Sequence, residues 1–195
     1  MSVEKINPGD STNITVTRGA GSVESVDMHG TYKAFCYDSA GNIKWEDEFP
    51  NAVTTVGKNL LLDTHFKSSN VTAFTTTWYM GLIAANGYSA ISTADTMSSH
   101  TGWKESGENG ASAPGYSQST RRQLTLAAAS AGAKATSNAV IFSMSIGGTV
   151  KGAFIVNQST KAGSTGTLYS AGLFTVGDKV VTNGDTLNIT YTASA

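Results

Sequence analysis

Asp95, His100 and Glu105 are residues whose types could do chemistry, and they lie within one short stretch of the chain. Two carboxylates and an imidazole held together could bind a metal ion or carry out acid–base catalysis. Their spacing matches neither one face of a helix nor a known set of metal ligands. We therefore favour a polar loop folded back on the domain, and expect no catalytic, cofactor-binding or metal-binding residue.

A second group of carboxylates, Glu46, Asp47 and Glu48, could in principle act as the acid pair of a glycosidase. Alternation along a strand sends Glu46 and Glu48 to one face and Asp47 to the other. This pattern favours a solvated strand surface over a sugar-cleaving site. Cys36 is the only cysteine and lies in an apolar run, which predicts a buried and unreactive thiol.

The remaining candidates are aromatic and basic side chains that could bind a partner. Trp78 stands in a run that is apolar on both faces, which predicts a position in the core. Trp103 lies in a polar stretch and is the best candidate for an exposed aromatic anchor. It could contact a partner subunit, cover the end of the domain or stack on a sugar. Arg121 and Arg122 could form ion pairs at an interface or provide ordinary charges at a strand edge.

The elements that position these residues are mostly strands, because apolar and polar residues alternate along much of the chain. Residues 32–37 and 43–49 are separated by a turn sequence that contains aspartate and glycine, so we expect a hairpin there. We expect a second hairpin between residues 140–146 and 150–156, joined by a Gly-Gly pair.

The C-terminal end of the chain is expected to be a strand, with Leu187, Ile189 and Tyr191 facing inward. A turn at residues 183–185 should lead into it from residues 179–181.

One short helix is expected over residues 58–67, where apolar residues fall on one stripe. The alanine-rich residues 127–135 are interrupted by serine and glycine, so we expect a loop or a single turn. The composition of residues 87–119 predicts a long polar loop, and loops of such length are usually functional or mobile.

Many short strands, frequent turns and one helix predict an all-β sandwich or barrel over residues 31–195. Residues 1–30 differ, because Ile14 and Val16 lie in one weak strand flanked by glycines. We expect these first residues to form an extended N-terminal arm that could reach a neighbouring subunit.

The composition excludes several classes of protein. The 195 residues fit one domain, or one domain with an arm, and their net charge of -1 does not suit phosphate binding, so we expect no nucleic-acid partner. No stretch approaches the roughly 18 apolar residues of a membrane span. No apolar signal segment follows Met1, so we expect synthesis in the cytoplasm and no membrane partner.

Seven sequence pieces, taken in order, resemble structural proteins of tailed-bacteriophage particles. They are GNIKWE, NAVTTVGKNLLLD, WYMGLI, ADTMSSHTGWKE, RRQLTL, GTLYSAGLF and GDTLNITYT, and they cover most of residues 41–192. The resemblance is to head decoration, or cement, proteins, and it favours a jelly-roll-like β-sandwich. It implies a non-enzymatic protein without cofactors that binds the major capsid protein lattice and stabilises the head.

The resemblance also implies copies of the chain as partners, in a dimer or trimer, on the capsid surface of a virion made in a bacterial host. Five residues are our candidates for the partner interface: Ile14, Val16, Trp103, Arg121 and Arg122. An alternative is another virion component, such as a head fibre, tail tube or baseplate protein, with host-glycan binding through Trp103 and its loop.

Overall fold

The computed structural model describes residues 28–65, 77–108 and 113–195, and these are almost entirely strands and loops. The strands are β1 (His29–Tyr37), β2 (Ile43–Val53), β3 (Tyr79–Ala84), β4 (Lys104–Glu105), β5 (Gly115–Tyr116), β6 (Arg122–Gln123), β7 (Ala133–Ala135), β8 (Val140–Ile146), β9 (Gly148–Val156), β10 (Leu168–Leu173), β11 (Lys179–Val181) and β12 (Thr186–Ser194), and the helix is α1 (Thr55–His65). The prediction of an all-β, sandwich-like fold with one short helix is confirmed.

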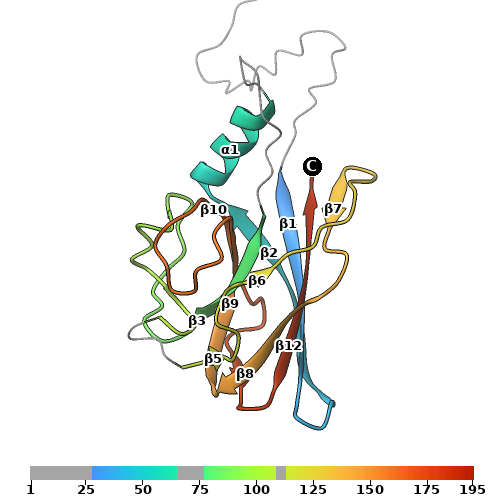
Figure 1. Ribbon diagram of the computed structural model, residues 1–195, viewed down its shortest axis with the longest axis vertical. Coiled ribbons are helices and arrows are strands. Elements are labelled where there is room, and N and C mark those ends of the chain that lie inside the picture. Colours follow the sequence, from blue (N-terminus) through green and yellow to red (C-terminus); the bar gives the residue numbers. More distant parts are fainter. Residues whose placement is uncertain (1–27, 66–76, 109–112) are drawn as a thin grey trace, which may run out of the picture.

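The strands pair antiparallel in one curled sheet with the order β4-β3-β9-β10-β2-β1-β12-β8-β5, and β6, β7 and β11 pair to its side. The curled sheet has two layers: one contains β1, β12, β8, β5 and β7, and the other contains β10, β9, β3, β4, β6 and β11. The long strand β2 joins these layers, because its first part pairs with β1 and its residues Asn51, Ala52 and Val53 pair with β10. Figure 1 shows α1 above the end of the molecule at which β1 begins and β12 ends.

The predicted hairpin between β1 and β2 is confirmed, and its turn explains why it forms. The Asp38 carboxylate accepts hydrogen bonds from the backbone N–H groups of Ala40 and Asn42, at 2.9 and 2.8 Å. Gly41 has a φ of 84°, which glycine adopts without a steric penalty. The predicted burial of Cys36 is also confirmed.

The predicted hairpin between residues 140–146 and 150–156 is wrong. β8 pairs with β12 and β5, whereas β9 pairs with β3, β10 and β11. Gly147 and Gly148 therefore carry the chain from one layer to the other. A Cβ atom on Gly148 would lie only 2.9 Å from the backbone nitrogen of Pro114, so the crossing requires glycine.

The C-terminal turn is a second crossing between layers. β11 pairs with β9, whereas β12 pairs with β1, β8 and β7. The predicted inward residues of β12 are confirmed, because Leu187 and Ile189 are fully buried and Tyr191 is 3% exposed. This strand contributes to the main core together with side chains of both layers.

The helix α1 begins three residues before the predicted start. The Thr54 hydroxyl caps it by accepting a hydrogen bond from the N–H of Gly57 at 3.0 Å. Leu61 packs against the core, whereas Leu62 is 55% exposed, so the apolar stripe is narrower than expected. Residues 127–135 are not helical, as predicted, and end in the short strand β7.

The described part of the chain starts at Met28, and β1 begins one residue later, just before the expected end of the arm at residue 30. Ile14 and Val16 therefore lie outside the described residues. The stretch 87–119, expected as one long loop, contains the short strands β4 and β5.

Candidate functional site

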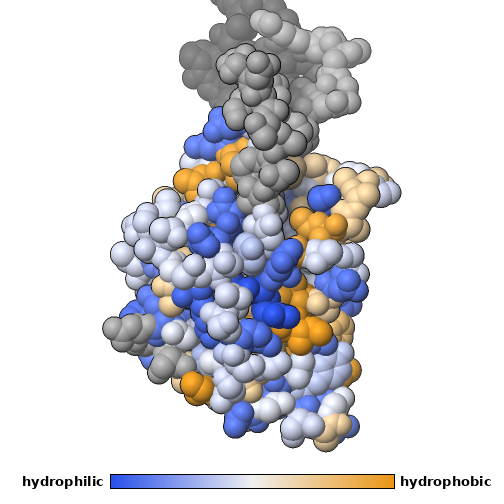
Figure 2. Space-filling view, in the orientation of Figure 1, coloured by the Kyte–Doolittle hydropathy of each residue, from blue (hydrophilic) through white to orange (hydrophobic). Residues whose placement is uncertain are grey.

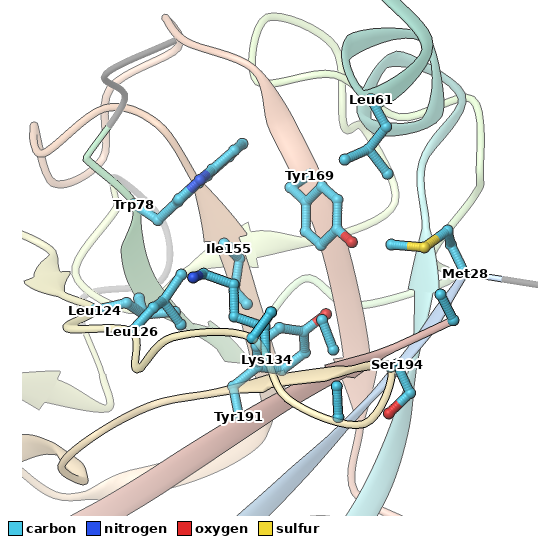
Figure 3. A pocket seen from close by; sticks show the side chains of 15 residues that line it. Met28, Leu61, Trp78, Leu124, Leu126, Lys134, Ile155, Tyr169, Tyr191 and Ser194 are labelled. Atoms are coloured by element: carbon cyan, nitrogen blue, oxygen red, sulfur yellow. The ribbon is translucent and has the colours of Figure 1, made fainter. Parts of the chain in front are cut away.

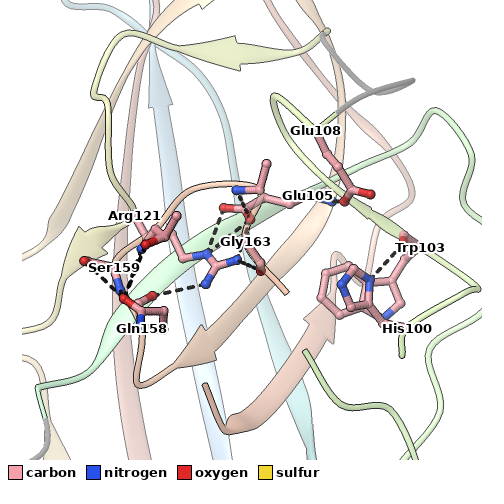
Figure 4. Close-up of polar contacts among 10 residues, drawn as sticks. His100, Trp103, Glu105, Glu108, Arg121, Gln158, Ser159 and Gly163 are labelled. Atoms are coloured by element: carbon pink, nitrogen blue, oxygen red, sulfur yellow. Dashed lines mark hydrogen bonds and ion pairs between the residues drawn. The ribbon is translucent and has the colours of Figure 1, made fainter. Parts of the chain in front are cut away.

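The carboxylate of Glu105 and the guanidinium of Arg121 form a buried ion pair that ties the 87–119 stretch to the loop after β9 (Figure 4). Arg121 Nε lies 3.1 Å from both Glu105 oxygens, and its Nη2 lies 2.8 Å from Oε2. The same guanidinium donates to the carbonyl oxygens of Gln158 and Gly163, and the N–H of Ala162 donates to Glu105. Every contact of this pair holds chain segments together.

Arg121 was expected at an interface or at a strand edge, and both expectations are wrong because its side chain is 0% exposed. Arg122 instead lies in β6 and is half-buried, and its Nε donates to the carbonyl oxygen of Ile141 at 2.9 Å. A role for Arg122 at a partner interface stays a prediction.

Trp103 was expected as an exposed anchor, and this expectation is wrong because the residue is 1% exposed. Its ring packs on Phe154, with ring centroids 5.1 Å apart, and stacks on His100 at 4.1 Å. Its Nε1 donates to Asp95 Oδ2 at 2.9 Å. The ring belongs to a second buried cluster, separate from the main core, that includes Phe154 and Leu168 of the sheet and Met97 of the 87–119 stretch.

Asp95, His100 and Glu105 do not form a shared site. Asp95 and His100 hold Trp103, whereas Glu105 holds Arg121. Within residues 28–65, 77–108 and 113–195, no group of three or more histidine, cysteine, aspartate or glutamate residues could hold a metal ion.

The carboxylates of β2 also serve the fold. Asp47 is buried and pairs with Lys179 at 3.0 Å, and it accepts the N–H groups of Thr175 and Val176. Glu46 and Glu48 are exposed on the other face, which agrees with the predicted solvated surface. Strand alternation therefore separates these carboxylates, as expected.

The feature best suited to binding is an apolar cavity of about 380 Å³ between the two layers, which we call the end cavity. Figure 3 shows its labelled side chains converging from several elements on one space beside the start of β1. Its apolar lining includes Met28, Leu61, Trp78, Leu124, Leu126 and Ile155. Trp78, expected in the core, is half-buried and lines this cavity.

Polar groups are few in the end cavity and lie mainly at its tyrosines. Burial raises the pKa values of Tyr169 and Tyr191, so both hydroxyls keep their protons at neutral pH. Asn51 donates to the Tyr191 hydroxyl at 3.0 Å. Lys134 is the only charged side chain among the described lining residues, and its ammonium donates to the carbonyl oxygen of Ala127 at 2.8 Å.

The apolar lining of the end cavity contrasts with the face of the molecule that Figure 2 shows. On the face shown in Figure 2, hydrophilic and neutral residues predominate, and hydrophobic residues appear as separate small patches. A recess with apolar walls and a few convergent polar groups is the usual form of a binding site. Nothing in the local sequence marks it, because its walls come from α1, from β9, β10 and β12, and from the loops around β3 and β7.

Comparison of the sequence with protein-family models gives no match, and comparison with curated proteins gives none either. No helix among the described residues combines the length and the apolar character needed to cross a membrane.

Proposed function

We propose that this chain is a non-enzymatic structural subunit of a tailed-bacteriophage head, which binds the major capsid protein lattice and other copies of itself. The proposal starts from the resemblance of residues 41–192 to head decoration proteins. A decoration protein stabilises the shell by burying surface across neighbouring coat subunits, so that separating them costs additional interface free energy.

The observation that carries the proposal is the end cavity. Its walls are hydrophobic and aromatic, and its described residues include no histidine, cysteine, aspartate or glutamate that could act on a bound molecule. An apolar recess of this kind suits the burial of side chains from a protein segment. Many copies on a lattice would add such contacts together through avidity.

The polar residues away from the cavity support binding over catalysis. Glu105, Arg121, Asp95 and Asp47 are engaged in hydrogen bonds or ion pairs that join separate segments of the fold. Each of these side chains therefore has a contact that accounts for it as part of the fold.

The alternative is a different virion part, such as a head fibre, tail tube or baseplate protein. Glycan binding by such a protein would need Trp103 as an exposed surface for stacking, but the Trp103 ring is buried against Phe154. The Trp103 ring therefore offers no exposed face on which a sugar could stack.

A sedimentation assay tests the proposal. The full chain is mixed with expanded heads, unexpanded heads or purified tails of the phage that encodes it, and pelleted particles are analysed for the chain. We expect saturable binding to expanded heads, and a reconstruction of the complex should show its density on the coat lattice. Binding to tails alone would support the alternative, and binding to none of these particles would overturn both.

A further inference from the structure

We propose that the end cavity receives the N-terminal segment, residues 1–27, of a second copy of this chain, with Ile14 and Val16 entering it. The inference rests on the proposed function, in which copies assemble with one another, and it names the residues that make that contact. Three observations carry it: the character of the cavity, the position of the N-terminal residues and the pattern of the segment itself.

The first observation is that the end cavity is open and apolar. Trp78, Leu61 and Leu126 are only partly buried around it, although they pack against the main core. Leaving such side chains in contact with water costs free energy that an apolar occupant would recover. Lys134 lies at the wall, but its ammonium is already bonded to a carbonyl oxygen. An uncharged, aliphatic occupant therefore fits best.

The second observation is the place where the N-terminal segment joins the fold. Met28 lines the end cavity, and β1 begins at His29, so 27 residues of the sequence are attached at its mouth. Val16 precedes Met28 by 12 positions, which allows a reach of about 40 Å when the chain is extended. The segment can therefore cross to a cavity on a facing molecule.

The third observation is the sequence of the segment. Ile14 and Val16 alternate with Asn13, Thr15 and Thr17, so an extended chain would present both aliphatic side chains on one face and polar ones on the other. The short aliphatic pair matches the apolar walls, and the polar face would remain toward water.

A second copy is a better source of the segment than the same copy. β1 begins at His29 beside the mouth of the cavity and runs from there along the sheet (Figure 1), so the point at which the segment is attached and the cavity lie at the same end of the molecule. Two copies that meet end to end about a twofold axis would each offer a segment and a cavity. Such an exchange satisfies both contacts at once, as in other self-complementary dimers.

Site-specific disulfides test the source of the segment. Chains carrying Ile14→Cys are mixed with chains carrying Ala129→Cys, since Ala129 is exposed and lines the cavity. The native Cys36 will not interfere, because it is buried. We expect a disulfide-linked heterodimer in non-reducing electrophoresis. The matched control is Ala40→Cys, an alanine that is also exposed and lies in the turn at the opposite end of the molecule.

Two outcomes would overturn the inference. The first is that a cysteine at position 14 forms a disulfide with a cysteine at position 129 no faster than with the control cysteine at position 40. This result would follow if residues 66–76 of the same chain filled the cavity. The other is a double variant, with cysteines at both 14 and 129, that forms only an intrachain disulfide at every soluble concentration, because this would make the same copy the source.

A charge-placement pair gives an independent measurement. I14D/V16D should weaken self-association by at least about tenfold in sedimentation equilibrium, because two carboxylates would have to enter an apolar cavity. T15D/T17D adds the same charge to the other face and should leave self-association close to that of the parent chain. Equal loss in both variants would show a general charge effect and overturn the inference.

The failure of this inference can be told from the failure of the proposed function. If the parent chain binds heads but gives no 14-to-129 cross-link, the decoration role stands and the second copy is not the occupant. If the cross-link forms but no phage particle is bound, the self-contact stands and the decoration role falls.

Discussion

Replacing Arg121 by methionine is the most direct test of the contacts that hold the 87–119 stretch in place. The substitution keeps much of the apolar stem but removes all donors to Glu105, Gln158 and Gly163. The Glu105 side chain is 1% exposed, so water would not replace the lost partner. The variant would leave a buried carboxylate whose charge is stabilised by the N–H of Ala162 and by the nearby ammonium of Lys161, but no longer by a guanidinium.

The burial of both partners sets the size of the effect. Removing one member of a buried ion pair costs about 3–5 kcal/mol, because the other charge stays desolvated. That is a large part of the roughly 5–15 kcal/mol by which a domain of ordinary stability is folded. The matched control is Lys151→Met, which breaks a pair with Asp178 whose side chains are 27% and 40% exposed. An exposed pair of this kind contributes about 0–1 kcal/mol.

Urea unfolding followed by tryptophan fluorescence would measure the difference, since Trp103 lies in the same stretch of chain. Arg121→Lys should also be destabilised, because an ammonium cannot make the two parallel bonds that a guanidinium makes to a carboxylate. If Arg121→Met lost less than about 1 kcal/mol of unfolding free energy, or no more than the Lys151 variant, the assignment of this ion pair as a structural tie would be refuted.

Three further predictions concern the thiol, one carboxylate and one glycine. Burial, with the nearby Asp185 carboxylate, raises the pKa of Cys36 from 9.0 to about 12. The native thiol should therefore not react with a disulfide reagent at neutral pH. The free energy of unfolding should fall as the pH rises from about 9 to 12, because the unfolded thiol ionises first, and it should fall less in C36A. Burial tends to raise the pKa of Asp185, but hydrogen bonds from Lys44 and Thr182 outweigh this effect and lower the pKa. The free energy of unfolding should therefore fall below about pH 3.8 in an acid titration, and it should fall less in D185N. In Gly152→Ala the new Cβ would lie 1.9 Å from a backbone oxygen of β10, so we expect no folded protein by circular dichroism.

The sequence predicts those parts of the fold that depend on neighbouring residues. The β1–β2 hairpin was predictable because Asp38 and Gly41 form its turn within five residues of chain. Alternation also identified which side chains of β12 face inward. It could not identify pairing partners, because a strand such as β8 shows the same pattern whether it pairs with the next strand or with β12. For this reason the sequence around Gly147 and Gly148 predicts a hairpin turn, although the chain crosses there to the other layer.

The positions of individual side chains depended on distant partners. Trp103 stands among polar residues in the sequence, yet Phe154 of β9 and His100 enclose its ring. Arg121 precedes another arginine, yet its partner Glu105 is 16 positions earlier. The end cavity was not predicted, because no single segment of the sequence contains its walls.

The adjacent ends of β1 and β12 determine how the domain would respond to mechanical load. His29 pairs with Ser194, and Tyr37 pairs with Thr186 at the other end of the ladder. A force that separated Met28 from Ala195 would open this antiparallel pair like a zipper, one hydrogen-bonded pair after another. A force between Met28 and the turn at residues 38–42 would instead act along β1 and load its bonds to β2 and β12 together. A subunit held at those two opposite ends would resist tension far better than one pulled at its two neighbouring ends.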